Sequence, residues 1–509
     1  GTSEDTNSVG TSENSNSELV FVNYRDIRDL NPHLYAGEMY AQSMLYDTLV
    51  SITDDGYEGC LAESWEISED GKIYTFKIRE GVTFSDGAVC DANAILANFN
   101  AIIANKERHT WLEMMNLLVG VSAPDDYTFV IELSEAYYPM LTELGCIRPF
   151  AMISPNCMID GQTKDGVNGY IGTGPYVLTD FVTDEYAVFE RNENYWGELP
   201  AIEKITVKVI PDNQTRIMAL ESGEIDLIFG KNMLDADAIS QYTDSDKFTV
   251  SLSDPTSTRH IVLNTTNDIL SDVTVRQALQ HATDRNAISE GIFYGLEQPA
   301  DTLYSKTVPY CDVDLEPYEY SADTASEMLE KAGWIMGKDG IRYKYGQKLE
   351  LELQYNSDSV TEKTISEYLQ SEYAKLGISI NIHGEEEQSY RDSMKAGNFD
   401  MVFNICWGMP YDPQSSLAAM RAPVYGDYAA QLGLEDKAEI DKAITDILTS
   451  TDETERQELY TFVLTRLHED AVYIPLTYEC NKALYTSDLQ GVHFGTDQYD
   501  VPFADMYFE

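Results

Sequence analysis

Two short stretches place an arginine beside aromatic side chains in a chain that has few positive charges. The stretch KERHTWLEM carries Arg108, His109 and Trp111, and the stretch CIRPF carries Arg148. A guanidinium binds a carboxylate through two parallel hydrogen bonds, so these arginines are candidates for holding an acidic ligand. The alternative is that each arginine pairs with a neighbouring carboxylate of the protein, because Asp and Glu are abundant throughout the chain.

A third stretch, DMVFNICWGMPYDPQSSLAAMR, places two aromatic residues between a strand and a helix. The apolar residues before Trp407 predict a strand buried on both faces, and Asp412 followed by Pro413 predicts the start of a helix. Trp407 and Tyr411 therefore lie where the strand has ended and the helix has not begun. In α/β proteins, ligands bind in the crevice beyond the carboxyl ends of the strands, which is where these two residues lie. The alternative is that Trp407 packs the loop into the core.

Signatures of catalysis or of a preassembled metal site are missing from the sequence. It contains no GxSxG, HExxH, GxxxxGK[ST] or EF-hand pattern, and Gly172 and Gly174 lack the third glycine of a dinucleotide loop. The 7 histidines never occur as an i, i+4 pair, and the 7 cysteines form no CxxC pair. We expect most of the cysteines to be small buried side chains. His109 is the one histidine that lies among other candidate ligand-binding residues.

The composition predicts a large acidic globular protein. At 509 residues the chain is long enough for two or three lobes, and 34 Lys plus Arg against 87 Asp plus Glu give a net charge of −53. That charge repels nucleic acid, so we expect no nucleic-acid partner. No apolar run is long enough to span a membrane. Residues 1–18 carry Val9 as their only apolar side chain, which predicts a disordered N-terminal tether.

The rest of the chain alternates predicted strands and helices, which is typical of an α/β fold. The turn Glu69-Asp70-Gly71 predicts a hairpin, and Asp91 predicts the cap of a helix that runs through Asn105. A strand–helix–strand pattern follows at residues 205–229, and near Pro255 a second α/β unit begins with a strand predicted at His260–Asn264. A capping box at Ser359 and Glu362 predicts the start of a helix. The segment AVYIPLTYECNKALY returns as strands near the C-terminus.

Several ordered motifs together resemble a known family. They are NPHLY, LAESWEISEDGKIYTFKIREGVTFSDG, IGTGPY, RNENYWGELPAIEKITVKVIPD, EKAGW and WGMPYDPQSSLAAMR. The chain is similar to the solute-binding proteins of peptide and nickel ABC importers (family 5), and most similar to its nickel-binding members. The resemblance implies a two-lobed periplasmic-binding-protein-like α/β fold of type II, with the ligand cleft between the lobes. The first lobe would span residues 19–258 and include the return at 479–509, and the second would span 259–478.

The resemblance also implies a ligand and its contacts. Nickel-binding relatives hold nickel(II) in complex with a small carboxylate-bearing chelator such as histidine, with no further cofactor. Carried over by motif, Arg108 and Arg148 would bind carboxylates, and Trp111 and Trp407 would stack on the complex. The residues implied to line the cavity are Met39, Tyr390 and Tyr411.

One departure concerns direct contact with the metal. Relatives often carry a metal-ligating histidine shortly after the helix that ends at Arg421, and here that place is Tyr425. His109 is the remaining candidate for a protein ligand to the metal. The missing histidine keeps open an alternative of the same fold, a di- or oligopeptide-binding protein. A secreted hydrolase is a third reading, which the missing catalytic motifs disfavour.

The resemblance further implies partners and location. The protein would be a monomer that delivers its ligand to the transmembrane subunits of an ABC permease. It would work on the outer face of the cell membrane, held by a lipid anchor, or in the periplasm.

Overall fold

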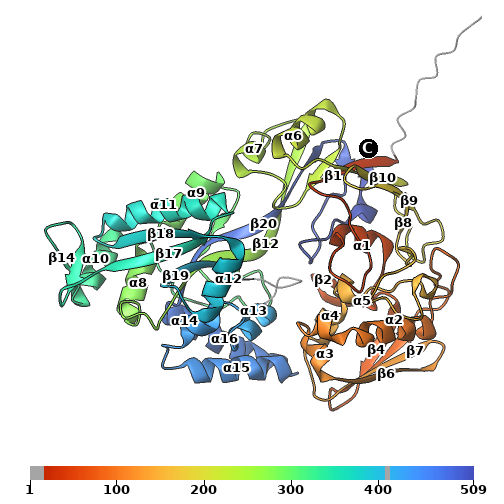
Figure 1. Cartoon of the computed structure of the whole chain (residues 1–509), viewed down its shortest axis with the longest axis horizontal. Helices are drawn as coiled ribbons and strands as arrows, with labels where there is room; N and C mark the ends of the chain where they lie inside the picture. Colours follow the sequence, from red (N-terminus) through yellow and green to blue (C-terminus); the bar gives the residue numbers. More distant parts are fainter. Residues whose placement is uncertain (1–16, 407–412) are drawn as a thin grey trace, which may run out of the picture.

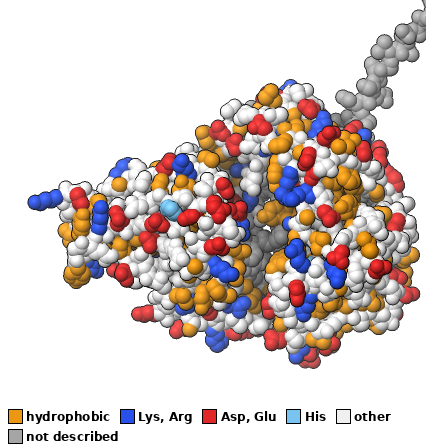
Figure 2. Space-filling view, viewed as in Figure 1, with side chains coloured by type: hydrophobic (Ala, Val, Ile, Leu, Met, Phe, Trp, Pro, Cys, Tyr) orange, Lys and Arg blue, Asp and Glu red, His pale blue; other side chains and the backbone are white. Residues whose placement is uncertain are grey.

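The computed structural model describes residues 17–406 and 413–509, and its two lobes are joined by a pair of long strands (Figure 1). The first lobe lies toward one end of these strands and the second lobe toward the other (Figure 1). A space-filling view shows a deep groove between the lobes (Figure 2). The chain therefore has the two-lobed α/β fold that the sequence predicts, with its ligand-sized space between the lobes.

One mixed sheet runs through both lobes. Its order is β18-β17-β19-β12-β20-β11-β1-β10-β9-β8, and β13 pairs with β20. The bounds are β18 Ser379–Glu385, β17 Glu350–Asn356, β19 Met401–Ile405, β12 Phe248–Leu263, β20 Tyr473–Thr486, β11 Leu227–Phe229, β1 Glu18–Asn23, β10 Lys204–Val209, β9 Tyr186–Arg191, β8 Tyr176–Val182 and β13 Gln298–Pro299.

Strands β12 and β20 form the hinge between the lobes. They pair antiparallel from Phe248 opposite Thr486 to Val262 opposite Tyr473, so each strand belongs to both lobes. The sequence predicted a strand only from His260, and this was wrong, because β12 continues through Pro255. Register shifts on both sides of Pro255 accommodate a residue that cannot donate to the ladder. These bulges place the irregular part of the ladder at the junction of the lobes.

The first lobe has three separate hydrophobic cores, which the sequence analysis did not distinguish. Two lie on opposite faces of the main sheet, since Phe21 of β1 packs into one and Val22 into the other, and the third lies between a four-stranded sheet, β4-β5-β7-β6, and helix α2. The predicted hairpin is the β4–β5 pair, and the predicted cap is present, since the Asp91 side chain accepts hydrogen bonds from the first turn of α2. The bounds of this lobe's other elements are α1 Met39–Leu45, β2 Val50–Thr53, β3 Gly56–Gly59, β4 Ala62–Ile67, β5 Ile73–Ile78, α2 Ala92–Ala104, η1 Lys106–His109, α3 Glu113–Leu117, β6 Leu118–Asp125, β7 Thr128–Leu133, α4 Met140–Leu144, α5 Ile147–Phe150, η2 Pro155–Cys157, α6 Asn213–Ser222, α7 Ala236–Ser240, β21 Leu489–Gln490, η3 Phe503–Asp505 and β22 Tyr507–Phe508.

The second lobe covers both faces of its part of the sheet with helices. In β19, Met401 and Phe403 pack into one core and Val402 into the other, so the predicted strand buried on both faces is confirmed. The Ser359 hydroxyl accepts from the Glu362 N–H at the start of α11, as the capping pattern predicted. The bounds are α8 Val273–His281, α9 Arg285–Phe293, α10 Ala322–Lys331, β14 Ile335–Met336, β15 Arg342–Lys344, β16 Gln347–Lys348, α11 Val360–Ala374, α12 Glu387–Ala396, α13 Pro413–Ala419, α14 Gly426–Gln431, α15 Lys437–Thr449 and α16 Glu453–Glu469.

Three further expectations can be compared with the described residues. All seven cysteines are buried and free. Glu18, which was expected to belong to the tether, is the first residue of β1, because it joins the ladder opposite Lys204. Among the helices described, none is both long and apolar enough to cross a lipid bilayer.

The lobes also touch at the end of the groove away from the hinge. The Arg456 guanidinium of the second lobe lies 3.4 Å from the ring centroid of Tyr138 of the first lobe. The Tyr138 hydroxyl donates to Glu453 and lies 3.2 Å from the Tyr310 hydroxyl, and the Tyr138 N–H donates to the Leu448 carbonyl at 3.1 Å. We call Tyr138, Tyr310, Glu453 and Arg456 the interlobe clasp.

Candidate functional site

The two arginine stretches of the sequence meet in one pocket of the first lobe. The 3₁₀ turn η1 follows α2 and contains Arg108, and the short segment after η1 contains Trp111. Arg148 comes from α5, about forty residues later in the chain, and the three side chains line a pocket of about 480 Å³ together with Tyr35 and Glu107. Candidates chosen for their chemistry thus share one pocket of the first lobe.

Arg148 is held by backbone carbonyls rather than by a carboxylate. Its Nη1 donates to the carbonyl oxygens of Tyr35, at 3.0 Å, and of Gly37, at 2.7 Å. Burial lowers the pKa of this guanidinium from its ordinary value, and the charges of Glu38 and Asp497 oppose that change. Among the ion pairs between described residues, none includes Arg108 or Arg148. Both guanidinium groups therefore remain available for an acidic ligand. The alternative, that each arginine pairs with a carboxylate of the protein, would require such an ion pair.

Tyr35 is a residue of this pocket that the sequence analysis did not single out. Its hydroxyl lies 2.7 Å from Trp111 Nε1 and 2.6 Å from His109 Nδ1, and its ring lies 5.8 Å from the Arg148 guanidinium. Burial raises the pKa of the phenol to about 12, so it is neutral. The one signal in the sequence was its place in the NPHLY motif, which by itself indicates only a turn.

His109 is adjacent to the pocket but fully buried. Its exposed fraction is 0%, and burial, together with the neighbouring Arg108 charge, lowers its pKa to about 4. Within residues 17–406 and 413–509, no group of three or more His, Cys, Asp or Glu side chains could hold a metal ion. Direct metal binding by His109 therefore stays a prediction without added support from neighbouring ligands.

The other predicted site residues differ in burial and in location. Met39 is the first residue of α1 and is buried. Tyr390 of α12 packs in a core of the second lobe, and its hydroxyl donates to the Phe403 carbonyl. Tyr425 precedes α14, is half-buried, and has a pKa that burial raises. Neither Tyr390 nor Tyr425 lines the arginine pocket. Trp407 and Tyr411 lie outside the described residues.

A larger cavity, of about 590 Å³, extends between the lobes. Its walls come from both lobes, from the bulged part of the hinge and from the clasp, and they are formed mainly by hydroxyl, amide and aromatic groups. Representative lining residues are Thr53, Tyr138, Thr256, Pro413, Tyr460 and Gln498. This space is large enough for a small organic ligand.

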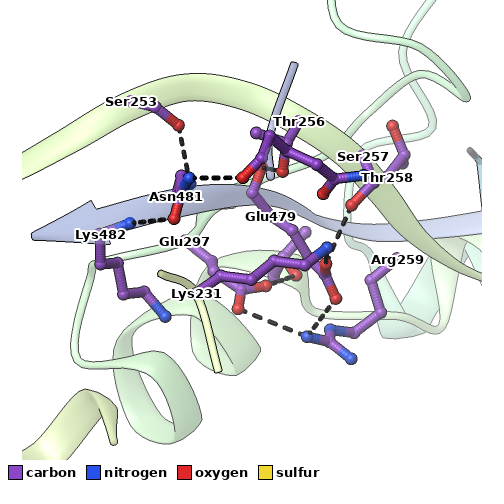
Figure 3. Close-up of polar contacts among 12 residues, drawn as sticks. Lys231, Ser253, Thr256, Ser257, Thr258, Arg259, Glu297, Glu479, Asn481 and Lys482 are labelled. Carbon is purple, nitrogen blue, oxygen red and sulfur yellow. Dashed lines mark hydrogen bonds and ion pairs between the residues drawn. The ribbon is translucent and has the colours of Figure 1, made fainter. Parts of the chain in front are cut away.

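The hinge carries its own charged cluster, in which Lys231 and Arg259 pair with carboxylates (Figure 3). Glu479 of β20 lies 2.9 Å from Lys231 Nζ and 2.8 Å from Arg259 Nη2, and it also accepts from the Ser257 hydroxyl. Arg259 is shared with Glu297, at 3.4 Å. Although burial opposes it, the two cations hold the pKa of Glu479 well below its usual range. The hinge cations are thus neutralised by hinge carboxylates, in contrast to Arg108 and Arg148.

Comparisons with known proteins agree with this geometry. Residues 56–427 match the family described as bacterial extracellular solute-binding proteins, family 5 Middle. The nickel-binding periplasmic protein of Escherichia coli strain K12 is 41% identical over 486 residues, which covers 94% of this chain and 93% of that protein. The dipeptide-binding protein of the same strain is 26% identical over 483 residues, covering 89% of this chain and 88% of that protein.

The fold comparison points to the same group. The crystal structure of NikA from Brucella suis in complex with Fe(III)-EDTA superposes with a TM-score of 0.92 at 43% sequence identity, and the match covers 97% of this chain and 100% of that one. The match extends over both lobes, so the similarity includes the groove between them.

Proposed function

Because the chain belongs to family 5 of the bacterial extracellular solute-binding proteins, we propose that it captures nickel(II) as a complex with a small carboxylate-bearing chelator, such as histidine. The family consists of solute-binding proteins and not of enzymes, so the hydrolase reading is dropped. In this proposal the protein delivers the complex to the transmembrane subunits of an ABC permease.

The observation that carries the proposal is the pairing of Arg108 and Arg148 with Trp111 in one pocket, with no carboxylate of the described residues bonded to either guanidinium. Two cations beside an indole fit a planar or compact complex whose outer atoms are carboxylate oxygens. The arginines would bind the carboxylates, and Trp111 and Trp407 would stack on the organic shell. We assign Met39, Tyr390, Tyr411 and Tyr425 to the surrounding wall.

The peptide-binding alternative has weaker support. Arginines and aromatic groups also suit a peptide carboxylate, but the nickel-binding relative is 41% identical to this chain and the dipeptide-binding relative 26%. Peptides are therefore the competing ligand in the experiment rather than a second proposal.

Calorimetric titration of the purified protein tests the proposal. Nickel alone should bind weakly, since dispersed surface carboxylates do not make a site. Nickel with L-histidine should bind tightly at one complex per protein. Tight one-to-one binding of the bare ion would contradict the chelate model, and saturable binding of dipeptides with no response to either nickel sample would favour the peptide alternative.

The location is the second part of the proposal. We infer that the polar residues 1–16 tether the protein to a lipid anchor on the outer face of the membrane, and that the protein works as a monomer. The support for the tether is that Val9 is its only apolar side chain, which is too little to pack against the lobes. Partition of the protein made in its host into the detergent phase tests the anchor, and light scattering tests the monomer.

A further inference from the structure

Tyr35 contacts Trp111 and Arg148 through different parts of its own structure. The hydroxyl is bonded to Trp111 Nε1 at 2.7 Å, and the backbone carbonyl accepts from Arg148 Nη1 at 3.0 Å. One residue thus holds two groups of the ligand pocket that come from distant parts of the chain.

The Tyr35 hydroxyl forms hydrogen bonds with both neighbouring rings. An indole N–H can only donate, so the Tyr35 oxygen accepts from Trp111. The same hydroxyl lies 2.6 Å from His109 Nδ1, and it donates its single hydrogen to that nitrogen or accepts from it according to the tautomer of the ring. In either tautomer, His109 forms one hydrogen bond that orients the hydroxyl.

Both ring nitrogens of His109 are poorly placed to bind a metal. Nδ1 is hydrogen-bonded to the Tyr35 hydroxyl, and Nε2 is buried and without a hydrogen-bond partner in the described part of the chain. A second proton would place a positive charge in a fully buried ring next to Arg108, and the low pKa of His109 agrees with a neutral ring.

We propose that His109 and Tyr35 are positioning residues of the chelate pocket, in which His109 orients the Tyr35 hydroxyl and Tyr35 fixes the plane of the Trp111 indole. This rests on the proposed function for what the pocket binds, and it gives His109 a role other than that of metal ligand. Trp111 is 50% exposed, so packing alone does not fix its ring. A ring already held in the stacking orientation binds a ligand more tightly, because less freedom is lost on binding.

Nuclear magnetic resonance of isotope-labelled tryptophan tests the positioning role directly. Tyr35→Phe removes the hydroxyl and keeps the ring and carbonyl, so the Nε1–H resonance of Trp111, identified with Trp111→Phe, should shift. The resonance of Trp196 is the internal control, because its Nε1 donates to Asp47 at 2.9 Å, away from the pocket. His109→Leu cannot form a hydrogen bond with the Tyr35 hydroxyl, so it should also shift the Trp111 resonance. His109→Gln keeps a hydrogen-bonding side chain, so its Trp111 resonance should lie closer to that of the unmodified protein.

Binding of two probes separates positioning from metal ligation. Tyr35→Phe and His109→Leu should each weaken binding of nickel with L-histidine, and also of Fe(III)-EDTA, by about tenfold, which corresponds to the loss of one hydrogen bond. Since EDTA already encloses its metal, loss of a protein ligand to the metal would leave Fe(III)-EDTA binding unchanged.

Two results would overturn the inference. One is a Trp111 resonance that stays in place in both Tyr35→Phe and His109→Leu. The other is a His109→Leu variant that loses affinity for nickel with L-histidine and keeps its affinity for Fe(III)-EDTA. If the unmodified protein binds neither probe, the proposed function fails, and the Trp111 resonance alone decides the positioning role.

Discussion

The arginines of this protein fall into two groups according to their partners. Arg259 lies between Glu297 and Glu479 at the hinge, and Arg456 is fully buried in the clasp, so both serve the structure. Arg148 is fixed by two carbonyls, which orient its guanidinium and leave its charge unpaired. Because Arg148 lines the pocket with Arg108, its charge faces the space that an acidic ligand would fill.

Replacing Arg148 by alanine should weaken binding of nickel with L-histidine by about 2–5 kcal/mol, because a desolvated carboxylate of the ligand would lose its partner. Calorimetry measures the change. Arg191→Ala is the matched control, since Arg191 pairs with the exposed carboxylates of Glu193 and Glu203. Equal, small effects of the two substitutions would show that Arg148 does not hold the ligand.

The buried His33 predicts a loss of stability in acid. Burial lowers its pKa from 6.5 to about 4, so the folded state keeps the ring neutral while the unfolded chain takes up a proton. The stability from this group is complete above pH 6.5 and is lost as the pH falls toward 4. The free energy of unfolding should fall when the pH is lowered from 7 to 5. This fall should be about 2 kcal/mol smaller in His33→Gln than in the unmodified protein. Urea unfolding at the two pH values measures this, and an equal loss in both proteins would contradict it.

At the scale of elements, local patterns predicted local structure well. The strand at Met401–Ile405 and the cap at Asp91 follow from residues that are neighbours in the sequence, and both are present. Pro255 misled the analysis, because proline usually ends a strand and here the partner strand absorbs it with bulges. Tyr35 could not be found for a related reason, since its partners lie 74 to 113 residues away.

The charged cluster of the hinge predicts a strong dependence of stability on Glu479. Glu479→Gln would leave Lys231 and Arg259 with a neutral partner in a largely buried setting, and the free energy of unfolding should fall by about 3 kcal/mol. Urea unfolding measures it. Glu387→Gln, at an exposed pair, should change stability by less than about 1 kcal/mol. A similar small change for Glu479→Gln would mean that solvent screens the hinge charges.

At the scale of the molecule, the ligand pocket and the hinge lie on different elements, and the two lobes meet again at the clasp. The arginine pocket belongs to the first lobe, and β19 and α13 of the second lobe lie on either side of the stretch that contains Trp407 and Tyr411. A ligand held by both would require the lobes to approach each other, which the bulged strands permit.

Small-angle scattering should therefore show a smaller radius of gyration when nickel with L-histidine saturates the protein. Tyr138→Ala removes the ring beneath Arg456 and the bond to Glu453, so the variant should have a larger radius and weaker binding. Tyr345→Ala is the control, because that ring is 99% exposed. A radius that does not respond to ligand or to Tyr138→Ala would contradict closure by lobe movement.

The position of the clasp affects how long the groove between the lobes stays closed. The hinge strands lie at one end of the groove and α15 and α16 at the other, so any rotation about the hinge moves the clasp through the longest arc (Figure 1). A small opening angle breaks the Tyr138–Arg456 contact before it disturbs groups near β12. Opening of the groove therefore requires the clasp contacts to break first. The strength of the clasp should set how long a captured solute stays inside, and under the proposed function the arginine pocket would select which solute is retained.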